Sequence, residues 1–337
     1  MQRRQTLRAI TAMAALPVAA AMGGLGFLPT AHAQVSDPAK WPTAGTVTLV
    51  VPSSPGGGTD AYGRILAQAL TDQLKQSFVV DNRPGASGAI GATFVARADP
   101  NGYTLLVASN SSLGINPVLY DKLTYDVDKD LAPVTRGVIA PMIIAVRPEL
   151  GLKSVKELIE RGKRDPGKMF YGSAGVGSPL YIGVRMLEDI GGAQFNHIPY
   201  KGIGPAYQDM LGGRLDFMLT DLASARPYVD SGKMQALAIT DKSHLLPDVP
   251  TLAEAGVRNF KAFASFSVML PAKTPPALVH RIADEINRAM KNPITLQRLD
   301  QQALIPVYDT PEKFAASLRE EHKTWGDFIK AKNITPD

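Results

Sequence analysis

Three observations predict an α/β protein with two lobes, mostly parallel sheets and a ligand cleft between the lobes. The chain has 337 residues, and at roughly 150 residues per domain this length suits about two domains. Its composition, 45% hydrophobic and 20% charged, is typical of a folded soluble protein. Short apolar runs alternate along the chain with segments of helical period, a pattern that indicates parallel sheets flanked by helices.

The expected elements follow from this periodicity. Apolar runs rich in β-branched residues are predicted to be strands: Val47 to Val51, Leu105 to Ala108, Met142 to Val146, Leu215 to Leu219 and Ala236 to Ile239. Segments with one apolar face are predicted to be helices: Ala61 to Leu74, Leu180 to Ile190, Leu278 to Met290 after Pro275-Pro276, and a last helix that begins at Thr310-Pro311 and runs through Phe328.

The first 33 residues are predicted to be a cleaved signal peptide. They combine a basic start, an apolar stretch and the small-x-small sequence Ala31-His32-Ala33, as secretory signals do. Pro17 and several glycines interrupt the stretch, which argues against a membrane anchor. Arg3-Arg4 leaves the choice between the general and the twin-arginine export routes open. The mature chain would begin at Gln34 and reside in the periplasm of a double-membraned bacterium.

Charge and cysteine content exclude several classes of function. Lys and Arg number 36 against 31 Asp and Glu, a formal charge of +5. Without the leader arginines the mature chain carries 5 − 3 = +2, and no basic run interleaved with aromatics marks a nucleic-acid surface. The chain has no Cys, which excludes a catalytic thiol, a disulfide scaffold and an iron–sulfur cluster.

Two glycine-rich turns carry the strongest functional signal. Residues 50–60 and 170–179 each join an apolar strand to a predicted helix through small residues. Glycine permits close backbone approach, and the first turn of a helix leaves N–H donors free for an anion. Ligands of open α/β sheets also collect at the carboxyl ends of the strands. The two turns could therefore hold opposite ends of a dicarboxylate, although each alone could be an ordinary tight connection.

Enzyme motifs receive little support. The Walker-like string of residues 162–168 is followed by Met169 where a hydroxyl is needed. The mature histidines are far apart and lack metal-ligand spacing, so neither a metal nor a cofactor is predicted. Asp60 and Asp221 follow predicted strands, and Asp60 suits a structural cap or a backbone partner better than a proton carrier. An exported hydrolase that uses Asp60 or Asp221 remains one alternative, and a ligand sensor for a membrane kinase is another.

An ordered set of motifs then resembles a known family, the periplasmic solute-binding receptors of tripartite tricarboxylate transporters, often called Bug-type receptors. The matching stretches span nearly the whole mature chain: Val51-Pro52 with residues 55–60, Asn82 to Gly88, Ile115-Asn116-Pro117 with Leu119-Tyr120, Tyr171 to Gly175 with Gly177-Ser178, Tyr200-Lys201-Gly202 with Pro205-Ala206, Gly212-Gly213 before Asp216, and Pro250 to Gly256.

This resemblance implies a two-lobed clamshell whose first lobe, 34–140 and 262–337, is discontinuous and whose second lobe is 141–261. It implies a carboxylate held by backbone amides and small hydroxyls. The implied contacts are Ser54, Gly57, Gly58, Thr59 and Asp60 in the first lobe and Ser173, Ala174, Gly177, Ser178 and Asp221 in the second.

Ser109, Ser53 and Tyr181 complete the predicted ligand-binding site. Ser53 stands where relatives commonly have an aromatic residue, and Tyr181 stands where they commonly have His. A smaller residue at 53 would free volume for a longer or aromatic dicarboxylate. Tyr181 could stack on such a ligand or pack into its own helix, and a C4 acid remains an alternative ligand.

The sequence therefore predicts a non-enzymatic, monomeric receptor. It would capture an organic carboxylate, close over it and deliver it to the membrane subunits of a secondary tripartite transporter. No nucleic-acid partner is expected.

Overall fold

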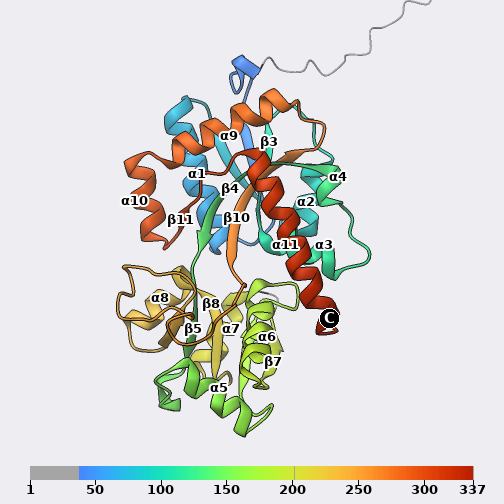
Figure 1. The fold of residues 1–337 in the computed structure, drawn as a ribbon. Coiled ribbons are helices and arrows are strands. Elements are labelled where there is room, and N and C mark those ends of the chain that lie inside the picture. The colour runs from blue at the N-terminus through green and yellow to red at the C-terminus, as the bar shows by residue number, and fades with distance from the viewer. Residues whose placement is uncertain (1–37, 201, 337) are drawn as a thin grey trace, which may run out of the picture. The chain divides into compact units, whose positions relative to one another are not determined.

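The protein is built on two mixed sheets with helices on their faces (Figure 1). The computed structural model describes residues 38–200 and 202–336. The predicted signal peptide, 1–33, lies outside the described residues, so its cleavage stays a prediction. We call the part built on the first sheet the first lobe and the part built on the second sheet the second lobe.

The first sheet has six strands in the order β11-β4-β10-β3-β1-β2. β1 is parallel to both β2 and β3, whereas β10 is antiparallel to β3 and β4, and β11 is antiparallel to β4. The bounds are β1 Val47–Val51, β2 Phe78–Asn82, β3 Thr104–Ser109, β4 Leu131–Ala140, β10 Ala264–Pro271 and β11 Ile305–Pro306.

The second sheet has five strands in the order β7-β6-β8-β5-β9. β6 is parallel to β7 and β8, and β5 is antiparallel to β8 and β9. The bounds are β5 Met142–Val146, β6 Phe170–Ser173, β7 Asn196–Pro199, β8 Phe217–Asp221 and β9 Gln235–Ile239.

The predicted α/β class holds, but the expectation of mostly parallel sheets needs correction. Parallel pairing is confined to the strands that lead into and flank the glycine-rich turns. β4 ends at Ala140 and β5 begins at Met142 in the other sheet, while β10 returns beside β4. β4 carries the chain out of the first sheet and β10 brings it back, so these two neighbouring strands run in opposite directions. The predicted lobe limits at 140/141 and 261/262 stay a prediction.

Several helices begin where the sequence offers a side-chain cap or a proline, whereas α1, α2 and α7 begin after a glycine. Thr310 caps the last helix by accepting a hydrogen bond from the Lys313 N–H, and Pro311 occupies its first position, as predicted. The bounds of the longer helices are α1 Gly58–Leu74, α2 Ala89–Ala96, α5 Val155–Arg164, α6 Pro179–Gly191, α7 Ile203–Leu211, α8 Leu222–Asp230, α9 Pro276–Met290, α10 Pro293–Gln301 and α11 Pro311–Ala331. The segment after β3 is a π-helical turn, Ser111–Ile115, followed by the short helix α3, Asn116–Leu119.

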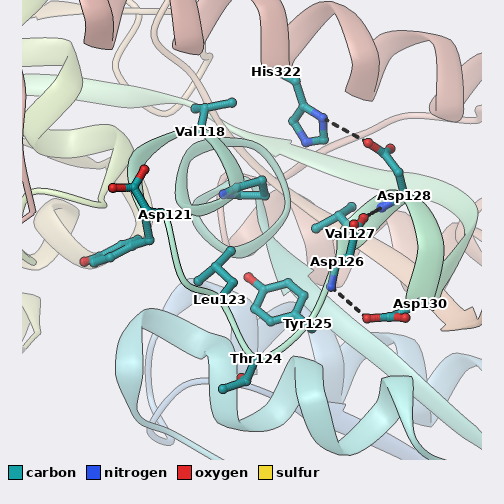
Figure 2. Close-up of a pocket in the computed structure, with 12 residues that line it drawn as sticks. Val118, Asp121, Leu123, Thr124, Tyr125, Asp126, Val127, Asp128, Asp130 and His322 are labelled. Carbon is teal, nitrogen blue, oxygen red and sulfur yellow. Dashed lines mark hydrogen bonds and ion pairs between the residues drawn. The ribbon is translucent and has the colours of Figure 1, made fainter.

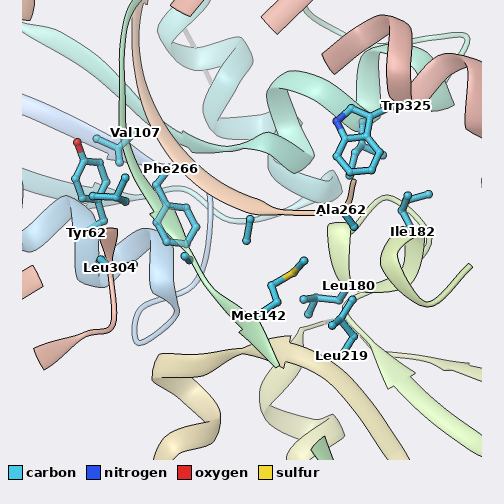
Figure 3. Close-up of a cluster of buried hydrophobic side chains, with 14 of the residues drawn as sticks. Tyr62, Val107, Met142, Leu180, Ile182, Leu219, Ala262, Phe266, Leu304 and Trp325 are labelled. Atoms are coloured by element: carbon cyan, nitrogen blue, oxygen red, sulfur yellow. The ribbon is translucent and has the colours of Figure 1, made fainter. Parts of the chain in front are cut away.

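One buried apolar cluster continues from the first lobe into the second (Figure 3). It joins Tyr62 of α1 and Phe266 of β10 to Met142, Leu180 and other side chains of the second lobe. None of the helices within 38–200 and 202–336 is both long and apolar enough to cross a membrane.

Candidate functional site

The first glycine-rich turn presents free backbone donors. Gly57 is the N-cap of α1 and supplies no side-chain hydrogen bond. Among the described residues, nothing accepts a hydrogen bond from the N–H groups of Gly58, Thr59 or Asp60. A Cβ on Gly57 would meet no atom within 4 Å. The helix start thus offers unpaired donors beside open space, which is the arrangement that binds an anion.

Asp60 holds this turn in shape. Its carboxylate accepts hydrogen bonds from the Gly56 N–H at 3.0 Å, from Arg64 Nε at 3.0 Å and from Asn82 Nδ2 at 2.9 Å. Burial raises the pKa of Asp60, but the hydrogen bonds from Arg64, Gly56 and Asn82 outweigh that effect, so its pKa lies below the usual range. Asp60 is therefore an ionised structural residue in the first turn of α1, where it is a backbone partner of Gly56, and the N-cap itself is Gly57.

The hydroxyl residues of the first turn differ in accessibility. Ser54 is exposed and Thr59 is buried at 8% exposure. Ser53 Oγ is buried and has no hydrogen-bond partner among the described residues, while the Ser53 carbonyl accepts from Asn82 Nδ2 at 3.0 Å. Ser109, at the end of β3, is half-buried. The Ser53 hydroxyl accordingly does not point into open space.

The second turn satisfies most of its helix start with its own atoms. Ser178 Oγ accepts from the Tyr181 N–H at 3.3 Å and donates to the Gly175 carbonyl at 2.8 Å. Pro179, the first residue of α6, has no N–H. Only Leu180 in this first turn keeps a free N–H among the described residues. The two glycine-rich turns thus differ in the number of free N–H donors that they offer to an anion.

Ser173 and Tyr181 contact His197, which was not among the predicted site residues. Ser173 Oγ lies 2.7 Å from His197 Nε2 and accepts from the Gly175 N–H at 3.1 Å. The Tyr181 ring centroid lies 4.6 Å from that of His197. The parallel pairing of β6 with β7 places His197 beside Tyr171, so the register of these strands was the only signal that could have found it.

Asp221 also has a structural role. It is the N-cap of α8, and its carboxylate accepts from the Ser224 N–H at 2.9 Å. No hydrogen bond or ion pair in the described part of the chain joins Asp60 to Asp221. Residues 38–200 and 202–336 also contain no group of three or more His, Asp or Glu side chains placed to hold a metal ion.

The second turn contacts the first lobe through the segment that follows β3. Ser111 Oγ donates to the Gly177 carbonyl. A Cβ on Gly177 would lie 2.8 Å from Asn116 Oδ1. No hydrogen bond or ion pair of the described residues joins 57–60 directly to 173–178. The structure therefore brings Gly177 to the contact between the lobes, with Ser111 and Asn116 as partners that sequence reasoning did not single out as site residues.

A separate cavity of about 580 Å³ lies in the first lobe, under α11 (Figure 2). Its lining includes the carboxylates of Asp121, Asp126, Asp128 and Asp130. Asp126 caps a short helix by accepting from two backbone N–H groups, and Asp130 accepts from the Asp126 N–H. Like charges repel an anion, so this cavity is unsuited to a carboxylate ligand.

Comparison with known proteins identifies the family. Residues 62–334 match the model of the tripartite tricarboxylate transporter family receptor. The Bordetella pertussis protein BugT is 34% identical over 287 residues, 84% of this chain and 88% of BugT.

Two solved structures are similar to this chain over most of its length. R. palustris Rpa4515 with adipate is 30% identical, has a TM-score of 0.82, and the match covers 88% of this chain and 100% of that chain. Rhodopseudomonas palustris MatC with bound malate is 30% identical, has a TM-score of 0.76, and the match covers 85% of this chain and 99% of that chain. The predicted family and two-lobed fold are confirmed: the chain belongs to the receptors of the tripartite tricarboxylate transporter family.

Proposed function

We propose that this receptor binds a dicarboxylate between its two glycine-rich turns, with one carboxylate on the start of α1. The observation that carries the proposal is the set of unpaired N–H groups at Gly58, Thr59 and Asp60, beside open space at Gly57. A carboxylate there would gain charge-assisted hydrogen bonds and the favourable end of the helix dipole. The adipate and malate bound to similar receptors support a ligand of this class.

The second lobe contributes in a different way. Because Ser178 and Pro179 satisfy or remove most donors of α6, the other end of the ligand would meet the turn 173–177 through backbone N–H groups. The Ser173 hydroxyl is fully buried and bonded to His197 and Gly175, so it would shape the turn without reaching the ligand. Asp60 shapes the first turn, Asp221 caps α8, and Tyr181 supports the second turn through His197. The remaining predicted contacts, Ser54, Gly57 and Ala174, line the space between the turns in this proposal.

The wider setting follows from the family. Its receptors work with tripartite transporters, so the partners of this chain would be a small carboxylate and the membrane subunits of such a transporter. We further propose that the chain is exported by its leader, acts as a monomer in the periplasm and catalyses no reaction. The lobes would be 34–140 with 262–337, and 141–261, with closure about their crossings.

Mass spectrometry of natively purified protein, denatured to release bound molecules, tests this function. We expect a co-purified dicarboxylate, and calorimetric titration of the stripped protein should show saturable binding of that acid. The recovered acid should be chemically unchanged after prolonged incubation. Failure to bind any carboxylate of a broad panel would overturn the proposal, and conversion of the acid into a product would favour the hydrolase alternative.

A further inference from the structure

Phe266 lies where the first turn, the sheet and the second lobe meet. It belongs to β10, and a Cβ on Gly58 would lie 2.7 Å from Phe266 Cζ and 3.1 Å from Cε2. The ring therefore touches the residue that begins α1. Phe266 also pairs with Ser109 across the antiparallel β3–β10 ladder, and directly opposite residues of such a pair point to the same face of the sheet.

The ring is fixed in this position from behind. It stacks on Tyr62, one turn further along α1, with centroids 6.3 Å apart and planes 23° apart. In Figure 3 it lies in the cluster that continues to Met142 and Leu180. Phe266 is 7% exposed, so only a small part of this residue can meet a ligand, and its ring packs against Gly58, whose N–H is free among the described residues.

These contacts give the proposed carboxylate site one polar side, formed by backbone N–H groups, and one apolar side, formed by the Phe266 ring. In the proposed site, backbone N–H groups would bind the charged oxygens, whereas the Phe266 ring offers no hydrogen-bond partner to the atoms that follow the carboxylate. A hydroxyl forced against the ring would lose its water without replacing the hydrogen bond, which is costly. A methylene or aromatic carbon would gain an apolar contact there.

We infer that Phe266 is a specificity-determining residue of the cleft, which selects carboxylates whose carbon next to the carboxylate carries no hydroxyl. This inference rests on the proposed function and adds the chemical class of the ligand to it. Unsubstituted aliphatic or aromatic dicarboxylates fit the site, and 2-hydroxy acids fit it poorly.

Succinate and tartrate provide the sharpest comparison, because tartrate differs from succinate by a hydroxyl beside each carboxylate. Tartrate therefore cannot avoid the ring by binding in the reverse direction. Titration calorimetry of the unmodified receptor should show succinate binding about tenfold or more tightly than tartrate. Phe266→Leu has a smaller side chain, which leaves room for a water molecule that can bond the tartrate hydroxyl, so this variant should narrow that ratio by about tenfold.

Phe314→Leu is the matched control, because Phe314 is a buried phenylalanine of a different cluster. It should leave the ratio unchanged, and melting curves of both variants report any general loss of stability. Phe266→Met serves as a second variant where Phe266→Leu does not fold. An equal affinity of the unmodified receptor for succinate and tartrate, or a ratio unmoved in the folded Phe266 variants, would overturn the inference while the receptor function stood. Absence of binding for every acid of the broad carboxylate panel, with succinate, tartrate, adipate and phthalate among them, would instead overturn the proposed function, and this inference with it.

Discussion

The hydroxyl of Ser111, two residues after the first-lobe strand β3, donates a hydrogen bond to the carbonyl of Gly177 in the second-lobe turn. The contact joins the lobes through atoms that lie beside the proposed ligand site. A second contact joins them at the surface, where Lys332 near the end of α11 pairs with Asp189 of α6. Exposed ion pairs contribute little, so the Ser111 bond is the more informative of the two to remove.

Ser111→Ala should weaken the closed arrangement of the lobes. The lost hydrogen bond is worth about 0.5 to 1.5 kcal/mol, so the dissociation constant for the ligand should rise by roughly two- to tenfold. Small-angle scattering should show a larger radius for the liganded variant than for the liganded parent protein. Ser317→Ala is the control, since Ser317 Oγ donates only to the Lys313 carbonyl of its own helix. Unchanged affinity and radius in Ser111→Ala would show that this bond does not contribute to closure.

Gly57→Val should block binding without harming the fold. Gly57 has extended backbone angles, φ −89° and ψ 170°, which a β-branched residue adopts readily. Its side chain would enter space that we assign to the ligand, so affinity should fall by about tenfold or more. Gly58→Val is a less direct test, because its Cβ would also displace Phe266.

Gly45→Val is the matched control for Gly57→Val. A Cβ on Gly45 also meets no atom within 4 Å, but Gly45 precedes β1 and so lies at the opposite end of that strand from the turn. Calorimetric titration should find normal affinity in Gly45→Val. Normal affinity in Gly57→Val as well would remove the first turn from the proposed site.

Asp60→Asn should destabilise the first turn at neutral pH. The amide cannot accept from Gly56, Arg64 and Asn82 as the carboxylate does, and we expect a loss of about 1 to 3 kcal/mol in the free energy of unfolding. Because the folded-state pKa of Asp60 is lowered, the contribution of the carboxylate is present above its unfolded-state pKa and is lost as the pH falls through the folded-state value.

Urea unfolding at pH 7 and at pH 3 measures this difference. The gap between Asp60→Asn and the parent protein should shrink at pH 3. Asp72→Asn is the control, because Asp72 is exposed and accepts only from Gln68 on the same helix. A gap that stayed constant with pH would assign the effect to packing instead of charge.

Glu321 should make stability fall as the pH rises toward neutrality. This carboxyl lies on α11 and accepts from Arg136 of β4. Burial raises its pKa to about 7 although Arg136 lowers it. A carboxyl with a folded-state pKa above its unfolded value contributes fully below the unfolded value and loses that contribution as the pH rises through about 7. The free energy of unfolding should change by about 3 kcal/mol as the pH rises from below the unfolded-state pKa of Glu321 to above its folded-state pKa.

Glu321→Gln tests this dependence, since the amide keeps an oxygen for Arg136 but does not titrate. Urea unfolding between pH 5 and pH 8 should give a falling free energy for the parent protein and a flatter curve for the variant. Glu320→Gln, at an exposed position of the same helix, should retain the slope of the parent. Parallel curves for all three proteins would contradict the assignment.

Tyr181→Ala should lower stability and affinity without changing ligand preference. The ring packs against His197 and the edge of the large apolar cluster, so its removal should cost about 1 to 3 kcal/mol of unfolding free energy. Phthalate and adipate should lose affinity equally, because the ring supports the second turn. A selective loss of phthalate binding would show instead that the ring stacks on the ligand, the other role that its sequence position allowed.

Local patterns predicted the elements that carry the site. The alternation of an apolar strand, glycines and a helix placed both turns correctly, and Thr310-Pro311 located the start of α11. β2, β4, β7, β10 and β11 were not predicted. β10 alternates Ser265, Phe266 and Ser267, a pattern typical of a half-exposed strand, yet all its residues are buried, because its two faces pack into two apolar clusters.

The side-chain contacts of the two turns could not be predicted in full from the sequence, because several of them join residues that are far apart in the chain. That Ser178 and Asp221 are N-caps could be read locally, but the partners Asn82 of Asp60, His197 of Ser173 and Phe266 of Gly58 come from other strands. Sheet register decides which of these side chains meet, and a single sequence does not specify register across parallel crossovers.

The unequal helix starts of α1 and α6 also set an order of events. An open receptor already offers unpaired N–H groups on the first lobe, whereas the corresponding helix of the second lobe is largely satisfied before any ligand arrives. The acid should therefore land on the first lobe, and the association rate should depend on that surface. The second lobe then covers the bound acid, and its opening governs the dissociation rate. A transporter that separates the second lobe from the first would therefore expose the acid for release without first replacing its hydrogen bonds to the first lobe.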